Sequence, residues 1–329
     1  MSTVHPPAPV RIGVLGCADI ARRRMLPAFA AQPGARLAAV ASRRVAGADA
    51  LAHAYGCRAV HGYDTLLSSE EVDAVYIPLP ASLHAHWAEA ALRAGKHVLA
   101  EKPLADAPHE VDRLFRIAAE RRLALMENVM FPHHGQHAAV QALVDDGAIG
   151  ELRAFQAVFA VPALPHDNIR YRPELGGGAL RDTGVYPVRA AVHFLGPALR
   201  VVGATVARGR GHRVDTAGAA LLCTSGGVTA QLSFGLDHAY RGSYELWGSA
   251  GRITVERAFT PPADHAPLIR LEDAAGGRVV EVAPDDQVAN AVRAFCDAAR
   301  RRTAPSDAVR EQTRLLDTIR RMQQASTGR

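Results

Sequence analysis

The sequence predicts an α/β domain followed by an α+β domain. Over residues 11–125, short apolar runs alternate with helical patterns, and this alternation implies βαβ units with a parallel sheet. From residue 126 onward, strand-like runs lie close together with glycine-containing turns between them, as in an open-faced, mainly antiparallel sheet. A chain of 329 residues is long enough to bury two hydrophobic cores.

The first domain, residues 11–125, is expected to follow a flexible tail at residues 1–10. Apolar runs bounded by turn residues predict its strands at 11–16, 36–42, 72–78, 97–101 and 123–128. Helical patterns follow the first strand as far as Phe29 and then occupy 46–55, 82–92 and 108–121.

The second domain, residues 126–329, has strand-like runs at 151–161, 201–208, 217–224, 228–236, 243–248 and 252–257. Thr224–Gly227 and Gly248–Gly251 are typical of hairpin turns. A helix over 286–324 closes the chain and can pack back on the first domain.

The composition indicates a cytoplasmic protein that binds anionic small molecules rather than nucleic acid. The net charge is +5, but the arginines are interleaved with 33 acidic residues and form no long basic run. The four cysteines stand far apart without a C-x-x-C pair, as expected in a reducing compartment. We expect no secretory signal and no membrane span. We also expect no metal site, because the histidines of FPHHGQH lack a third ligand with a supporting pattern.

A dinucleotide fingerprint occupies the first strand-to-helix turn, in GVLGCADIA. Gly16 supplies the tight turn, while Ala18 and Ala21 stand where further glycines are usual. The second strand ends at Ser42-Arg43-Arg44, where an NAD-preferring site usually places an acidic residue. Two guanidiniums suit a 2′-phosphate, so NADP(H) is the predicted cofactor, with a solvated arginine pair as the alternative.

Of the 38 lysine and arginine residues, only Lys96 and Lys102 are lysine. Lys102 follows a strand at its carboxyl end, where ligands of open α/β sheets bind. Lysine can surrender a proton to a carbonyl oxygen, whereas arginine effectively never does. An exposed strand-end lysine is the alternative. Lys96 follows a helix-ending glycine, and helix dipole and capping effects explain it.

A second cluster lies in YRPELGGGALRDTGVY. Its run of three consecutive glycines, Gly176–Gly178, allows the backbone to pass close to a ligand. Asp182 and Tyr186 are spaced i, i+4, so a helix starting here places them on one face, where they can hold a polyol or relay a proton. The alternative is a helix-terminal acid beside a packed tyrosine.

Three segments resemble the glucose–fructose oxidoreductase/inositol dehydrogenase (Gfo/Idh/MocA) superfamily: GVLGCADIAR, IPLPASLHAHWAEAALRAGKHVLAEKPLA and YRPELGGGALRDTGVYP. The resemblance covers nearly the whole chain. Within the superfamily, CADIARRRMLPAF and MENVMFPHHGQH are most similar to NDP-hexose 3-ketoreductases of deoxysugar biosynthesis. This implies a Rossmann-type first domain and an open sheet that often forms the oligomer interface.

The resemblance also implies roles for individual residues. The pyrophosphate loop falls on Leu15, Gly16, Ala18, Asp19 and Ile20. Further cofactor contacts fall on Ser42, Arg43, Arg44, Leu79, Pro80, His84, Glu101, Lys102 and Arg172. In relatives the lysine–proline bond of the EKP motif is often cis, so we expect a cis bond before Pro103. Tyr186 stands where many family members carry histidine, as the sugar ketoreductases tend to.

The resulting hypothesis is an NADPH-dependent reduction of a nucleotide-linked keto-deoxysugar. The expected substrate is a dTDP-3,4-diketo-2,6-dideoxyhexose, reduced at C3 to the 4-keto sugar. Lys102 would donate the proton, Tyr186 would position the sugar or share the proton transfer, and Asp182 would orient this group. We expect a homo-oligomer, dimer or tetramer, formed through the open sheet face. The alternatives are an aldose or inositol dehydrogenase and a non-catalytic dinucleotide-sensing regulator.

Overall fold

The computed structural model describes residues 8–327, so the predicted tail lies outside the described residues as far as residue 7. The chain forms two compact units. The first comprises the chain up to Leu104 together with His109–Asn128 and Val288–Ser306; the second comprises Ala105–Pro108, Val129–Gln287 and the chain from Asp307 onward. The predicted fold class, a parallel sheet followed by a mainly antiparallel one, is confirmed.

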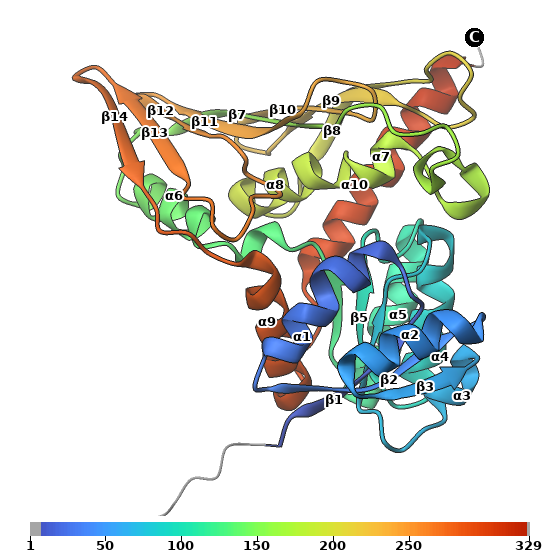
Figure 1. Cartoon of the computed structure of the whole chain (residues 1–329). Coiled ribbons are helices and arrows are strands. Elements are labelled where there is room, and N and C mark those ends of the chain that lie inside the picture. The colour runs from blue at the N-terminus through green and yellow to red at the C-terminus, as the bar shows by residue number, and fades with distance from the viewer. Residues whose placement is uncertain (1–7, 328–329) are drawn as a thin grey trace, which may run out of the picture. The chain divides into compact units, whose positions relative to one another are not determined.

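The first unit is built on a parallel sheet of six strands in the order β3-β2-β1-β4-β5-β6 (Figure 1). The strands are β1 (Val10–Leu15), β2 (Ala35–Ser42), β3 (Arg58–His61), β4 (Ala74–Ile77), β5 (His97–Glu101) and β6 (Leu125–Asn128). This is the doubly wound order, in which the strand order reverses between β1 and β4. Ligands of such sheets bind beyond the carboxyl ends of the strands at this point.

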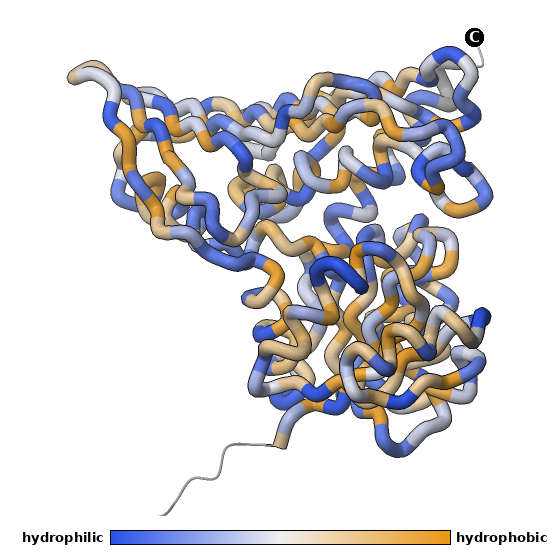
Figure 2. The backbone as a smooth tube through the Cα atoms, viewed as in Figure 1, coloured by the Kyte–Doolittle hydropathy of each residue, from blue (hydrophilic) through white to orange (hydrophobic). Residues whose placement is uncertain are grey.

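Helices connect these strands. They are α1 (Leu26–Ala31), α2 (Val45–Tyr55), α3 (Tyr63–Leu67), α4 (His84–Arg93) and α5 (Pro108–Arg121). Helix α9 (Gln287–Arg301), from near the end of the chain, also belongs to this unit. The strands β1 and β4 are almost completely buried because helices cover both faces of the sheet, as their near-continuous apolar sequences predict. In Figure 2, hydrophobic residues are concentrated along the strands in the interior of the unit.

The second unit is built on a sheet of eight strands in the order β14-β13-β12-β11-β7-β10-β9-β8. The strands are β7 (Leu152–Ala160), β8 (Arg200–Ala207), β9 (Ala217–Cys223), β10 (Thr229–Gly235), β11 (Arg241–Gly248), β12 (Gly251–Val255), β13 (Leu268–Asp273) and β14 (Gly276–Glu281). Strand β10 pairs with β7 in parallel, and the other pairs described are antiparallel. The predicted strands match β7 to β12, while β13 and β14 were not predicted.

The helices of the second unit are α6 (Gly135–Asp145), α7 (Ala179–Asp182), α8 (Val185–Leu195) and α10 (Asp307–Thr327). Helix α8 packs on β7 and β10, and α10 packs on α8 and β8. Their apolar side chains meet the inner face of the sheet in one core, in which Phe155, Tyr244 and Phe259 are among the largest buried side chains. The opposite face of the sheet carries exposed side chains, including Trp247.

The sequence predicted one helix over 286–324, and this prediction is wrong: α9 and α10 are separate helices. Helix α9 ends with Arg302 in the left-handed conformation, at φ 54°, which closes a helix and bends the chain. Pro305 follows and disfavours helical geometry in the residue before it. Helix α9 belongs to the first unit, where Arg300 donates to the Gly34 carbonyl over 2.7 Å, whereas α10 belongs to the second.

Among the described residues, every helix is too short or too polar to cross a bilayer. The same part of the chain holds no group of three His, Cys, Asp or Glu side chains arranged to bind a metal ion.

Candidate active site

Gly16 forms the turn between β1 and the first helical segment. Its φ of +113° is a conformation that L side chains rarely adopt, and a Cβ atom here would lie 2.9 Å from Leu79 Cδ2. Its amide also donates to the Ala41 carbonyl over 2.8 Å, which holds the turn against the end of β2. Glycine is therefore required at this position, and the loop passes close to the predicted strand-end residue Leu79.

The remaining residues of this loop differ in exposure. Leu15 is buried, Ala18 and Ile20 are half-buried, and Asp19 is exposed. The Asp19 carboxylate accepts a hydrogen bond from Arg22 over 2.7 Å and forms an ion pair with Arg23 at 2.6 Å. These interactions, the Arg22 bond first, hold the pKa of Asp19 below its ordinary value. The partner arginines offset its negative charge at a loop that is predicted to face a pyrophosphate.

The end of β2 gathers hydroxyl, thiol and guanidinium groups. Ser42 Oγ accepts from the Arg44 amide over 3.0 Å and also bonds the Cys17 thiol, whose pKa is nevertheless raised by burial. Arg43 and Arg44 are exposed. Burial raises the pKa of the Tyr63 hydroxyl, and the neighbouring Arg43 guanidinium opposes that rise.

These residues fit NADP(H). Gly16 has no Cβ, so the backbone of the turn can come close to a pyrophosphate. The two exposed guanidiniums follow a strand end that carries no acidic residue, which suits a 2′-phosphate. The contact between Tyr63 and Arg43 was not predicted, because Tyr63 follows β3 and only the folded sheet brings it to the end of β2.

The segment after β4 is tied to the EKP segment by His84. Its Nε2 lies 2.6 Å from the Leu79 carbonyl oxygen, and its Nδ1 lies 2.7 Å from the Pro103 carbonyl oxygen. The ring is 1% exposed, whereas Leu79 and Pro80 are half-buried. Both polar atoms of His84 thus face the backbone.

The EKP segment is held from several sides. The Glu101 carboxylate accepts from Tyr76 Oη and Asn128 Nδ2, each over 2.7 Å. Beyond Pro103, the Leu104 amide donates to Glu127 over 2.8 Å. The Lys102–Pro103 bond is cis, which confirms the prediction.

Tyr76, Asn128 and Glu127 were not predicted as parts of this site. Asn128 and Glu127 lie in the MENV stretch, where polar residues at the end of a buried strand are the only sequence signal. The half-buried Lys102 therefore projects from a backbone whose neighbouring residues are fixed to β4 and β6.

In the second unit, Asp182 and Tyr186 do not share one continuous helix. Helix α7 ends at Asp182 and α8 begins at Val185, with Thr183 and Gly184 between them. Asp182 Oδ2 accepts from Arg170 Nε over 2.7 Å. The Tyr186 ring is 8% exposed and packs edge-on against Phe159, with the ring centres 4.6 Å apart.

The glycine run before α7 serves the fold directly. A Cβ on Gly178 would lie 2.4 Å from Asp215 Oδ1, so only glycine admits this carboxylate. Asp215 Oδ2 in turn accepts from the Leu180 amide over 2.6 Å and satisfies the start of the helix. Burial raises the pKa of Asp215, while the bond from Leu180 opposes that rise. Arg172 precedes this run with an exposed side chain.

His137 of the FPHHGQH segment is a structural residue. His137 is fully buried; its Nε2 lies 3.1 Å from the Ala258 carbonyl and its Nδ1 lies 2.9 Å from Tyr244 Oη. The carbonyl can only accept, so Nε2 carries the proton and Tyr244 donates to Nδ1. Burial lowers the pKa of His137 well below its ordinary value, in agreement with a neutral ring.

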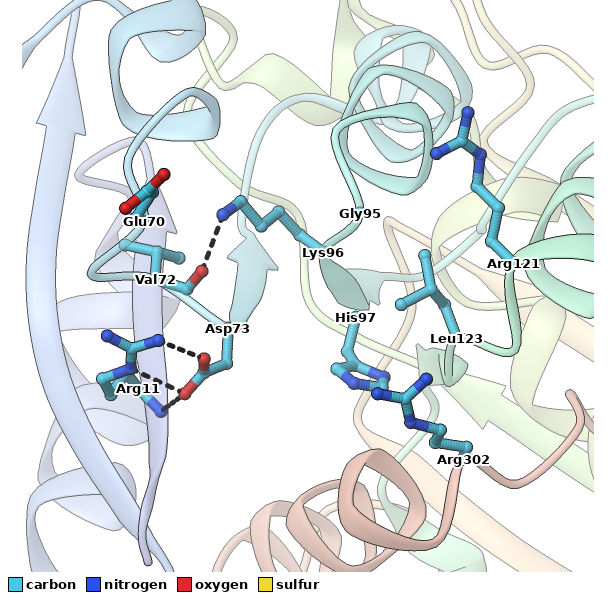
Figure 3. Close-up of a pocket in the computed structure, with 10 residues that line it drawn as sticks. All are labelled: Arg11, Glu70, Val72, Asp73, Gly95, Lys96, His97, Arg121, Leu123 and Arg302. Carbon is cyan, nitrogen blue, oxygen red and sulfur yellow. Dashed lines mark hydrogen bonds and ion pairs between the residues drawn. The ribbon is translucent and has the colours of Figure 1, made fainter.

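In the first unit, a pocket of about 530 Å³ lies at the amino end of the parallel sheet, opposite the carboxyl end that carries the predicted cofactor residues (Figure 3). Its lining residues are Arg11, Glu70, Val72, Asp73, Gly95, Lys96, His97, Arg121, Leu123 and Arg302. Its position is at the end of the sheet where open α/β folds do not bind ligands.

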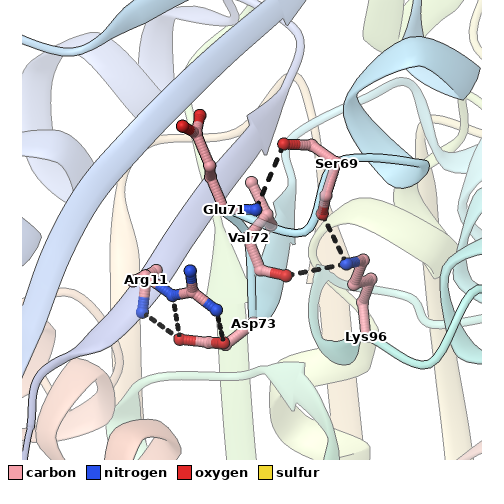
Figure 4. Close-up of polar contacts among 6 residues, drawn as sticks. All are labelled: Arg11, Ser69, Glu71, Val72, Asp73 and Lys96. Carbon is pink, nitrogen blue, oxygen red and sulfur yellow. Dashed lines mark hydrogen bonds and ion pairs between the residues drawn. The ribbon is translucent and has the colours of Figure 1, made fainter.

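The inner charges of this pocket are satisfied by the protein itself (Figure 4). The Arg11 guanidinium grips the Asp73 carboxylate with two bonds, of 2.9 and 2.6 Å. Lys96 Nζ donates to the carbonyls of Ser69 and Val72 over 2.7 and 2.8 Å. The explanation of Lys96 by helix dipole and capping alone is therefore incomplete, because its ammonium group also joins two strand-flanking segments.

Comparison with known proteins agrees with this arrangement. Residues 10–129 match the oxidoreductase family with an NAD-binding Rossmann fold, and residues 137–254 match the GFO/IDH/MocA C-terminal domain. The chain belongs to this oxidoreductase family. The predicted resemblance to the Gfo/Idh/MocA superfamily is thereby confirmed, and the chain is an oxidoreductase.

Among Gfo/Idh/MocA relatives, the dTDP-3,4-didehydro-2,6-dideoxy-alpha-D-glucose 3-reductase of Actinomadura kijaniata is 49% identical over 316 residues, which cover 95% of each chain. The enzyme of the same name from Streptomyces violaceoruber is 50% identical over 94% of each chain. The crystal structure of a 3-ketoreductase from Actinomadura kijaniata in complex with NADP and TDP-benzene has a TM-score of 0.92 and 48% identity, and covers 95% of this chain and 97% of that chain.

Proposed function

We propose that this oxidoreductase reduces the C3 ketone of a dTDP-3,4-diketo-2,6-dideoxyhexose to the 4-keto-2,6-dideoxyhexose with NADPH. The observation that carries the proposal is the 49% identity, over 95% of both chains, to an enzyme named for this reduction. The local structure supports it, because the residues at the end of β2 fit NADP(H) and Lys102 follows the end of β5.

The first unit supplies the cofactor-binding groups. The loop from Leu15 to Ile20 would hold the pyrophosphate, since its glycine turn lets the backbone approach. Arg43 and Arg44 would hold the 2′-phosphate. Leu79, Pro80 and Glu101 would supply further cofactor contacts within the first unit, and Arg172 is a separate proposed cofactor contact. When bound, the nicotinamide supplies the hydride that reduces C3.

Lys102 donates the proton to the C3 oxygen in this proposal. A positioned acid contributes about 10²–10⁴-fold to such a step. The bonds to the Glu101 carboxylate and the Leu104 amide hold the residues on both sides of the lysine, so its side chain starts from a fixed position. An arginine cannot replace it as the acid, because a guanidinium does not release its proton.

Tyr186 positions the sugar or shares the proton transfer, and Asp182 orients this group. The packing of the Tyr186 ring against Phe159 limits the motion of the ring. The hydroxyl group is the part of Tyr186 that would contact the sugar. Arg170 fixes one oxygen of Asp182. Both residues therefore act from fixed positions within the second unit.

The test is an NADPH-oxidation assay with enzymatically generated dTDP-3,4-diketo-2,6-dideoxyhexose, followed by identification of the product. We expect a 4-keto sugar with a new C3 hydroxyl. The same preparation should oxidise free aldoses or inositols poorly. Efficient oxidation of a free sugar without reduction of the diketosugar would replace this proposal by the dehydrogenase alternative.

We propose further that the protein is a cytoplasmic homo-oligomer, a dimer or tetramer formed through the outer face of the second sheet. The strand registers place the exposed side chains of Leu221, Trp247, Leu268 and Val279 on this face. The free thiols of Cys17, Cys57, Cys223 and Cys296 agree with a reducing compartment. Light scattering should give an oligomer for the wild type and smaller species for Trp247→Glu; a monomeric wild type would refute it.

A further inference from the structure

We propose that His84 is a positioning residue that acts as a buried imidazolium and clips the Leu79 segment to the Lys102–Pro103 segment. The proposal rests on the function proposed above for Lys102 and the cofactor loop. It assigns His84 a role through the backbone in place of a direct contact with the cofactor.

The two contacts of His84 define its charge. Nδ1 lies 2.7 Å from the Pro103 carbonyl oxygen and Nε2 lies 2.6 Å from the Leu79 carbonyl oxygen. A carbonyl oxygen only accepts, whereas a neutral imidazole has one donor and one acceptor nitrogen. In either neutral tautomer, one lone pair would point at a carbonyl oxygen at hydrogen-bond distance. Both contacts are hydrogen bonds only when both nitrogens carry a proton.

Because His84 is buried, its ring nitrogens depend on these two hydrogen bonds. The side chain is 1% exposed, so water cannot replace a lost partner. A buried charge requires hydrogen-bond partners, and charge-assisted bonds are about twice as strong as neutral ones. His84 is also the first residue of α4, directly after a 3₁₀ turn at Ala81–Leu83, so the ring projects from a rigid helix start.

The clip connects the parts of the first unit that the proposed reaction needs. On one side, Leu79 packs over Gly16 of the pyrophosphate loop, because a Cβ on Gly16 would lie 2.9 Å from Leu79 Cδ2. On the other side, the Pro103 carbonyl belongs to the residue that follows Lys102. A change at His84 therefore shifts the cofactor loop through its Nε2 bond and the proton donor through its Nδ1 bond.

Two amide variants separate these bonds. The amide nitrogen of His84→Asn takes the place of Nδ1 and can keep the bond to Pro103, while that of His84→Gln takes the place of Nε2 and can keep the bond to Leu79. His84→Phe keeps neither. His86→Asn is the matched control, since His86 is exposed on the same helix.

The first measurement is the charge of His84 by ¹⁵N NMR of histidine-labelled wild-type enzyme at neutral pH. The signals that disappear in His84→Gln belong to His84. We expect two proton-bearing ring nitrogens with nearly equal shifts. One protonated and one unprotonated nitrogen, with widely separated shifts, would overturn the proposal.

The second measurement separates kcat from NADPH affinity, with kcat from diketosugar reduction and Kd from a fluorescence titration. A displacement of about 1 Å can cost about 10²-fold in rate, so His84→Phe should lower kcat by about 10- to 100-fold and also weaken NADPH binding. His84→Asn should recover kcat more than affinity, and His84→Gln should recover affinity more than kcat. His86→Asn should change neither.

The outcomes remain distinguishable. A His84→Phe enzyme with wild-type kcat and Kd, or amide variants that lose both properties equally, would refute the clip. If His84→Phe does not fold, the two amide variants and the wild-type NMR spectrum still decide. If the wild type reduces no diketosugar, the proposed function fails, while the NMR spectrum and the NADPH titrations still test His84.

Discussion

The two ends of the parallel sheet use the same basic residues in opposite ways. At the amino end, Arg11 is bound by Asp73, and Lys96 donates to two backbone carbonyls. At the carboxyl end, Arg43 and Arg44 follow a strand that ends without an acidic residue, and Lys102 stands in a segment held by its neighbours. Arg11 and Lys96 stabilise the fold through partners within the protein, whereas Arg43, Arg44 and Lys102 lie at strand ends of the kind where ligands of open α/β sheets bind.

The largest expected effect is on Lys102. Lys102→Ala should lower kcat by about 10²–10⁴-fold, because the proton donor is lost, and should leave NADPH affinity largely intact. Steady-state turnover and a fluorescence titration measure the two quantities. Unchanged turnover would move the acid role to Tyr186 or to water.

The next effect concerns the arginines after β2. Replacing Arg43 and Arg44 by alanine should reduce the preference for NADPH over NADH by about tenfold or more per residue, since hydrogen bonds to charged groups contribute about 1.5–3 kcal/mol. The ratio of kcat/KM for the two cofactors is the measurement. Arg36→Ala is the control, because Arg36 is exposed near the amino end of the same strand. An equal loss for both cofactors would contradict a 2′-phosphate contact.

At the amino end, Lys96→Met should reduce stability and leave the chemistry unchanged. The variant leaves the Ser69 and Val72 carbonyls without their donor, which costs about 1–3 kcal/mol for a buried group. Urea unfolding measures this loss, and kcat of the folded variant should equal that of the wild type. A drop in kcat without a loss of stability would show that the two ends are coupled.

The smallest effect is the acid dependence of the Arg11–Asp73 pair. The bond from Arg11 lowers the pKa of the Asp73 carboxyl in the folded protein. The stability that this pair contributes is therefore fully present above the carboxyl's ordinary pKa of about 3.9, and it is lost as the pH falls through the lower pKa of the folded state. Asp73→Asn should therefore be less stable than wild type at neutral pH, with a difference that shrinks below about pH 4. A difference that stays constant from pH 7 to about pH 3 would contradict this.

Much of the candidate site could be proposed from the sequence because its residues lie in local motifs. Gly16, Ser42-Arg43-Arg44 and Lys102 each follow a strand that alternation and apolar runs reveal, and parallel strands bring their carboxyl ends to one edge. The supporting groups were not predictable in this way. Tyr76, Glu127 and Asn128 act on the EKP segment from 23 to 27 residues away in the chain, and no local pattern encodes those pairs.

The second unit shows the same limit. The i, i+4 spacing of Asp182 and Tyr186 predicted one helix, but α7 ends at Asp182 and α8 begins at Val185, with Thr183 and Gly184 between them. The start of α7 also depends on a distant residue, because Asp215, 37 residues beyond Gly178, accepts from the Leu180 amide.

The sequence by itself determined the fold class and the NADP(H) cofactor, and it predicted the cofactor loop and Lys102 as the candidate acid, because apolar periodicity and strand-end motifs are local properties of the chain. Tertiary structure alone decided which groups the basic side chains meet. Lys96 and Lys102 are six residues apart on either side of one strand, yet the first is bound to carbonyls at the amino end and the second follows the carboxyl end. Partners that are distant in sequence, brought together by strand order, make that distinction.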